Sequence, residues 1–87
     1  MGKLNPIKTD GYFHLSSRNT YILDTYFDEK TSNYITAYYK NNEGSPEYVE
    51  VGRTKDKDQA IFNHRVCQST KFIEENYRKE IIDRGST

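Results

Sequence analysis

The sequence predicts an α+β fold in which a three- to four-stranded antiparallel meander packs on one long C-terminal helix. Two observations support this prediction. As far as residue 53, short runs rich in β-branched and aromatic residues alternate with polar connections, a pattern typical of strands joined by turns. From residue 56 onward, apolar residues recur at helical spacing. The 87 residues suit one domain, and we expect a flexible arm at 1–10, a single α+β domain at 11–83 and a disordered tail at 84–87.

Four segments are predicted to be strands. They span 11–15, 20–27 (TYILDTYF), 33–40 (NYITAYYK) and 47–53 (EYVEVGR). Polar residues that favour turns separate them at 16–19, 28–32 and 41–46, where Gly44 suits a positive φ. Short connections favour antiparallel pairing of consecutive strands, so a meander is expected.

A helix is predicted over 56–83. Asp56 is a good N-cap, and Gln59 three residues later completes a capping box. An apolar stripe along one side should pack on the sheet, and it comprises Phe62, Val66, Thr70, Ile73, Tyr77 and Ile81. Ser69 and Thr70 compete with helix hydrogen bonding, which allows a break or kink at 68–70.

Composition limits the function classes. The chain has 13 basic and 13 acidic residues and a formal net charge of zero, whereas non-specific nucleic-acid binders usually carry an excess of Lys and Arg. Cys67 is the only cysteine, so an intrachain disulfide cannot form. Neither a long apolar run nor a signal peptide is recognisable, and we expect a cytoplasmic protein. The abundance of Lys, Asn, Tyr and Ile fits an AT-rich phage or low-GC bacterial genome.

Strand alternation divides the sheet residues between two faces. Val49 and Val51 are expected to face the helix, together with Ile35, Ala37, Tyr39, Tyr21, Leu23 and Phe27. The opposite face then carries four tyrosines, which are Tyr26, Tyr34, Tyr38 and Tyr48. Exposed rings on a sheet stack on nucleic-acid bases or anchor protein interfaces, although Tyr is also a good strand former that pairs across strands. With Arg18, Lys40 and Arg53 at the margins, these tyrosines form the predicted binding surface.

The predicted helix offers a second contact. Ile61 and Phe72 point away from the apolar stripe, alongside Arg65, and we interpret them as a contact for a dimer mate or another partner. Scattered apolar residues on a surface are also normal. If the helix breaks near Ser69, Phe72 turns inward instead.

The sequence carries no P-loop, dinucleotide-binding fingerprint, nucleophile elbow or paired-cysteine zinc pattern. His64 and Cys67 are three residues apart on the predicted helix, but a stable metal site needs more ligands. His14 and His64 would be the acid–base pair of a small nuclease, and nothing in the sequence places them together. We therefore expect no enzyme activity, no catalytic residues, no metal and no cofactor.

Residues 48–60 resemble the junction between the last strand and the helix in the arm-type DNA-binding domains of phage integrases and in the related ethylene-response-type plant domains. Gly52 and Ala60 match that junction in spacing, Asp56 stands in place of its Thr and Gln59 in place of its Glu, whereas Thr54 replaces an aromatic residue. The resemblance implies a three-stranded sheet against one helix and DNA contacts made from the strands, often by Arg. Here the corresponding strand face is mostly Tyr.

The sequence therefore predicts a small non-enzymatic binding protein. The first hypothesis is a phage or mobile-element regulatory factor that binds RNA or DNA through the Tyr-rich face. The alternative is a phage-encoded inhibitor of the anti-defence type that binds a host protein through the same face, and a small nuclease is the third. A homodimer is compatible with both binding hypotheses, and neither a membrane nor a small-molecule substrate is expected.

Overall fold

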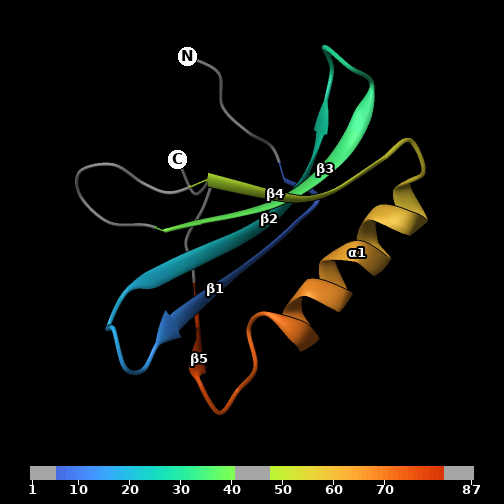
Figure 1. Cartoon of the computed structure of the whole chain (residues 1–87). Coiled ribbons are helices and arrows are strands. Elements are labelled where there is room, and N and C mark those ends of the chain that lie inside the picture. The colour runs from blue at the N-terminus through green and yellow to red at the C-terminus, as the bar shows by residue number, and fades with distance from the viewer. Residues whose placement is uncertain (1–5, 41–47, 82–87) are drawn as a thin grey trace.

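A computed structural model describes residues 6–40 and 48–81, which form one antiparallel sheet and one helix (Figure 1). The elements are β1 Lys8–His14, β2 Thr20–Asp28, β3 Asn33–Lys40, β4 Tyr48–Thr54, α1 Lys57–Thr70 and β5 Tyr77–Glu80. The strand order is β4-β3-β2-β1-β5, so β4 and β5 are the edges. α1 lies across one face of the sheet and contacts β4, β3 and β2. The predicted α+β fold with an antiparallel meander is confirmed.

The predicted length of the helix is wrong. α1 has 14 residues and ends at Thr70, at the point where the sequence allows a break. The Ser69 hydroxyl donates to the Arg65 carbonyl and the Thr70 hydroxyl to the Val66 carbonyl, bonds of the kind that weaken a helix. A turn at Ile73–Tyr77 then returns the chain to the sheet. β5 is a fifth strand and pairs with β1. It was not predicted, because 71–83 was assigned to the helix.

The predicted flexible arm is also too long. Lys8, Thr9 and Asp10 belong to β1 and pair with β2. The side chain of Thr9 binds Asp24, and that of Asp10 binds His64 and Lys79. The tail at 84–87 lies outside the described residues, as does Gly44. None of the described helices is long and apolar enough to cross a membrane.

The helix face of the sheet is aromatic. Its core cluster consists of Tyr12, Leu23, Cys67, Phe72 and Tyr77, with Tyr21 and Tyr38 packed against it. Phe72 stacks on Tyr12 with a centroid distance of 4.5 Å. Phe72 is therefore a core residue and not the surface contact predicted for it, because the helix ends before it and the chain turns inward. Of its predicted companions, Ile61 is half-buried and Arg65 is exposed.

The predicted apolar stripe of the helix is wrong as well. α1 buries Ala60, His64 and Cys67 against the sheet, whereas Phe62 and Val66 remain exposed. Ile81, at the far end of the predicted stripe, is almost fully exposed. The spacing i, i+4, i+7 is still helical, but small residues and a histidine make this face, which lets the helix lie close to the strands.

The faces assigned to β3 are reversed. Four residues connect β2 to β3, from the pair Asp28 and Asn33, so that Leu23 lies opposite Tyr38 and Phe27 opposite Tyr34. Residues opposite each other in an antiparallel pair share a face, and this face is the one beneath α1. Tyr34, Thr36 and Tyr38 therefore face the helix, while Ile35, Ala37 and Tyr39 face away.

Candidate functional site

A β-bulge interrupts the edge strand β4. Val49 pairs with Tyr38 and Glu50 with Ala37, but the next pair is Gly52 with Thr36, which leaves Val51 as an extra residue. The bulge places both Val51 and Gly52 on the helix side. Glu50 and Arg53 consequently lie together on the opposite face, although three positions separate them, an arrangement that a regular strand does not allow.

This local geometry produces an ion pair within the strand. The Arg53 guanidinium donates two hydrogen bonds to the Glu50 carboxylate, at 2.9 and 2.8 Å. The hydrogen bonds from Arg53 outweigh the effect of desolvation and lower the pKa of Glu50. Arg53, which the sequence reading placed on a nucleic-acid surface, is thus already matched with a carboxylate.

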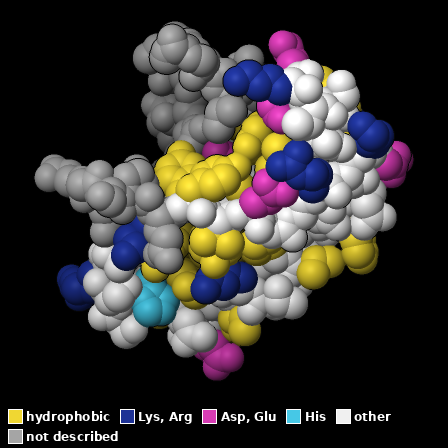
Figure 2. Space-filling model, turned by 45° about the horizontal axis from the view of Figure 1, so that its top comes forward, with side chains coloured by type: hydrophobic (Ala, Val, Ile, Leu, Met, Phe, Trp, Pro, Cys, Tyr) yellow, Lys and Arg dark blue, Asp and Glu magenta, His cyan; other side chains and the backbone are white. Residues whose placement is uncertain are grey.

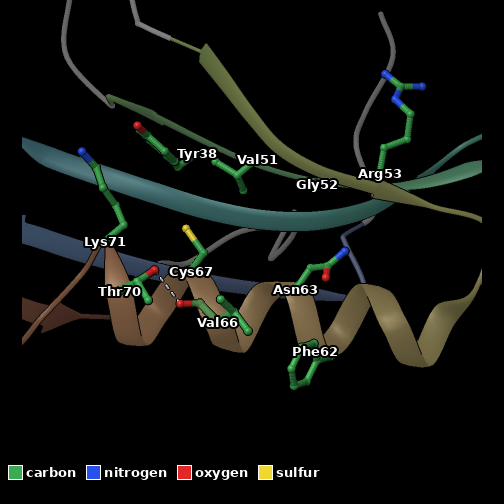
Figure 3. A pocket seen from close by; sticks show the side chains of 10 residues that line it. All are labelled: Tyr38, Val51, Gly52, Arg53, Phe62, Asn63, Val66, Cys67, Thr70 and Lys71. Atoms are coloured by element: carbon green, nitrogen blue, oxygen red, sulfur yellow. Dashed lines mark hydrogen bonds between the residues drawn. The ribbon is translucent and has the colours of Figure 1, made fainter.

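A groove of about 540 Å³ runs between β4 and α1 (Figure 3). Tyr38 and Cys67 line its inner part, Val51 its strand wall and Val66 its helix wall. Strand and helix approach closely at Gly52, where an added Cβ would lie 3.0 Å from the Asn63 Nδ2. Because glycine has no side chain, the helix packs closely here.

The walls of the groove expose apolar side chains to solvent. Val51 is 44% exposed, Val66 41% and Phe62 59%. Phe62 and Val66 are one helical turn apart and both border the groove with Val51. Figure 2 shows hydrophobic side chains gathered across the middle of the molecule, with Lys, Arg, Asp and Glu side chains interspersed among them. We call the strand β4 together with Phe62 and Val66 the β4–α1 surface.

A lysine stands at one end of the groove. Lys71 follows the last turn of α1, and its Nζ lies 5.2 Å from the centre of the Tyr38 ring, a cation–π contact. No carboxylate among residues 6–40 and 48–81 forms an ion pair with this ammonium group.

The tyrosines predicted to form one binding face are divided between two. Tyr34 and Tyr38 face α1, together with Lys40, whose strand partner is Tyr21. Tyr26, Tyr48 and Arg53 lie on the opposite face, and Arg18 is exposed in the β1–β2 turn at a positive φ of 64°. The structure therefore brings only part of the predicted set together.

Tyr26 and Tyr48 do meet on that opposite face. Their hydroxyls are 2.5 Å apart, which joins β2 to β4 across β3. Partial burial, together with this hydrogen bond, raises the pKa of Tyr48. Tyr48 is still more than half exposed, so its ring is available to a partner.

A polar chain runs through the core, and sequence reasoning missed it. His64 Nε2 lies 2.8 Å from Asp10 Oδ2, and His64 Nδ1 lies 2.9 Å from the Thr25 hydroxyl. Thr25 in turn contacts the Thr36 hydroxyl at 2.8 Å, and the Lys79 ammonium pairs with Asp10 at 2.8 Å. The chain links all the elements except β4. The helical spacing of Ala60, His64 and Cys67 was the only signal in the sequence.

Burial and charge set the protonation of this chain. Burial lowers the pKa of His64, against the opposing effect of Asp10, so the imidazole is neutral near pH 7. Its Nε2–H donates to Asp10, and its Nδ1 accepts from Thr25. Burial alone would raise the pKa of Asp10, but hydrogen bonds from Lys79 and His64 outweigh it and lower the pKa.

The order Thr25, His64, Asp10 has the connectivity of a nucleophile, base and orienting acid. Thr25 and His64 are both fully buried, however, so this cluster does not reach a substrate. His14 takes no part in it and instead contacts the Ser17 hydroxyl. Both ring nitrogens of His64 are engaged, and across the described residues no group of three His, Cys, Asp or Glu side chains could hold a metal ion.

Comparisons with protein-family models, with curated proteins and with solved structures find no match to this chain.

Proposed function

We propose that this chain is a non-catalytic protein-interaction module whose β4–α1 surface docks onto another protein chain. A single observation carries the proposal. Val51 and Val66 expose apolar side chains on the two walls of a groove, with Phe62 one helical turn from Val66, next to β4, which pairs with β3 alone among the described strands. Contiguous exposed apolar side chains beside polar ones are typical of protein interfaces.

The charges near this surface favour a protein partner over nucleic acid. Phosphate binding needs several cations that are not already matched. Of the two cations that line the groove, Arg53 is bound to Glu50. The other, Lys71, suits a single carboxylate of a protein better than a phosphate backbone. The earlier hypothesis, RNA or DNA binding through tyrosines, stays a prediction. It now rests on Tyr26, Tyr48 and Arg18, and it requires binding that weakens steeply as salt is raised.

The inhibitor hypothesis is one form of this proposal, in which the docked chain is a host protein. We place the interaction in the cytoplasm, because the single cysteine is a buried free thiol and contributes no disulfide. The small-nuclease hypothesis receives no support from the histidine–carboxylate cluster described above, since Thr25 and His64 in that cluster are fully buried.

The proposal is tested by capture from nuclease-treated lysate of cells that express the tagged chain together with an untagged copy. Wild type is compared with Val51→Lys and Val66→Lys, and with Leu15→Lys as a matched control. Leu15 is an exposed apolar residue in the β1–β2 turn, outside the groove. We expect at least one protein, either the untagged copy or a different chain, to be lost from both groove variants by about tenfold or more and retained by the control. Identical capture by all four proteins would refute the proposal.

A further inference from the structure

We infer that the chain docked on the β4–α1 surface is a second copy of this protein, with β4 antiparallel to β4 of the other copy around a two-fold axis between Val51 and Gly52. This inference rests on the function proposed above and names the partner. It follows from the free edge, from the bulge and from the charges that the bulge aligns.

The first requirement is an edge that can accept a strand. Among the strands of residues 6–40 and 48–81, β4 is at the edge of the sheet and pairs only with β3. Its other side therefore presents backbone N–H and C=O groups that the described ladder does not use, which is a template for strand addition. Pairing with a second β4 would join the two five-stranded sheets into one, with both copies of α1 on the same face.

The second requirement is agreement of faces across a two-fold axis. Residues opposite each other in antiparallel strands share a face, so in a regular strand residues three positions apart cannot pair in a symmetric dimer. The bulge removes this restriction, because Glu50 and Arg53 share the face away from the helix. Around the proposed axis, Glu50 lies opposite Arg53 of the second copy, and Val51 lies opposite Gly52 of the second copy.

A bulge on an edge strand usually discourages pairing, because it bends the strand away from a straight partner. In this arrangement each β4 pairs with β4 of the second copy, and the two bulges meet at the axis. Both strands then bend at the same point, so the pairing continues in register on either side.

Charge complementarity favours the second copy in particular. The side chains of Glu50 and Arg53 are 35% and 42% exposed, so both reach solvent near the free edge. A two-fold axis between them adds an Arg53 to each Glu50 and a Glu50 to each Arg53. The formal net charge of zero also means that two copies do not repel each other at long range.

The helix side of the joint carries apolar side chains. Val66 forms the helix wall of the groove, opposite Val51 of β4, and the axis would set it toward Val66 of the second copy. Gly52 has no side chain, which leaves space for Val51 of the second copy. The dimer therefore covers Val51 and Val66, which are 44% and 41% exposed in one copy.

The test measures the mass of the purified full chain across a concentration series by light scattering and sedimentation. We expect a dimer, of twice 10.3 kDa. Val66→Lys should weaken it about a hundredfold, and Leu15→Lys should leave it unchanged. A monomer at every concentration would overturn the inference. If Val66→Lys nevertheless abolished capture of a different protein from lysate, the proposed function would stand with another occupant, such as a strand of that protein.

Charge reversal tests the register. Glu50→Arg puts like charges opposite one another in the dimer, and so does Arg53→Glu; each should weaken the dimer about tenfold. The double variant Glu50→Arg/Arg53→Glu should restore it. A mixture of the two single variants should form a mixed dimer in native mass spectrometry, because each supplies the charge that the other lacks. A wild-type dimer unaffected by both reversals, or the absence of a mixed dimer, would refute this pairing.

Discussion

His64 is the residue whose loss should disturb the fold most. It is fully buried beneath α1 and holds β1 through Asp10 and β2 through Thr25. His64→Ala removes both hydrogen bonds and leaves a space the size of an imidazole ring between helix and sheet. Neither partner is left alone, because Asp10 keeps Lys79 and Thr25 keeps Thr36.

The expected loss in the free energy of unfolding of His64→Ala follows from these contacts. The bond to the Asp10 carboxylate is worth about 1.5–3 kcal/mol, and the bond to Thr25 about 0.5–1.5 kcal/mol. A ring-sized cavity adds to this, so the loss is in the range of about 3–5 kcal/mol that aromatic-to-alanine changes cost. For a domain of this size the melting temperature should fall by roughly 15–30 °C, a large part of the stability that such a domain has.

Urea unfolding followed by circular dichroism measures the change, with Thr36→Val as the graded control. Thr36→Val keeps the shape of the side chain and removes only the outermost hydroxyl, so it should cost about 1 kcal/mol. A His64→Ala variant that loses less than about 1 kcal/mol would show that the polar chain contributes nothing to stability. A loss equal to that of Thr36→Val would contradict the central role of the histidine.

Three further predictions concern local features. First, the pKa of His64 is lowered from 6.5 in the folded chain. Below pH 6.5 His64 is therefore protonated more fully in the unfolded chain than in the folded chain, and the free energy of unfolding falls as the pH falls. Thermal melts between about pH 7.5 and about pH 5.5 should show this slope in wild type and a weaker one in His64→Ala. Second, Gly52→Ala should destabilise by about 1 kcal/mol, because the new Cβ meets Asn63; Gly52→Ala/Asn63→Ala should recover most of that loss, and urea unfolding of the single and double variants would measure both effects. Third, Asp56→Ala should cost about 0.5–2 kcal/mol in thermal unfolding, because its carboxylate accepts the Gln59 backbone N–H at 2.9 Å.

Local chemistry in the sequence predicted much of the fold. The strands β2, β3 and β4 are found within a residue or two of the predicted ranges, because β-branched and aromatic runs bounded by turn residues have few alternatives. The start of the helix was also predicted. Asp56 caps α1 as its spacing to Gln59 indicates, since a cap is a contact between near neighbours in the chain.

Features that depend on distant partners could not be predicted. Tyr77–Glu80 continues the helical pattern of the residues before it, and only its pairing with β1 makes it a strand. The polarity of Lys8 to Asp10 indicated a loose arm, because the partners that bury Asp10 are His64 and Lys79. Neither residue is close to Asp10 in the sequence.

The predicted assignment of β3 residues to the two faces of the sheet was wrong for a different reason. Alternation fixes which residues of one strand share a face, but the connection between two strands fixes how those faces match. Four residues between Asp28 and Asn33 bring odd-numbered residues of β2 opposite even-numbered residues of β3. Tyr34 and Tyr38 therefore lie beneath the helix. Eight tyrosines in the chain made either arrangement compatible with an apolar core.

The same reasoning explains why the bulge matters more to the candidate site than any one side chain. If all seven residues of β4 alternated regularly, Glu50 and Arg53, which are three positions apart, would lie on opposite faces. The ion pair and the symmetric pairing that we propose would then both be lost. Deleting Val51 removes the bulge but leaves Glu50 and Arg53 two positions apart and on one face, so the dimer should persist, weakened only by the loss of the Val51 side chain. A Val51 deletion that folds but no longer dimerises, while Val51→Ala still does, would show that the pairing of Glu50 with Arg53 does not select the partner.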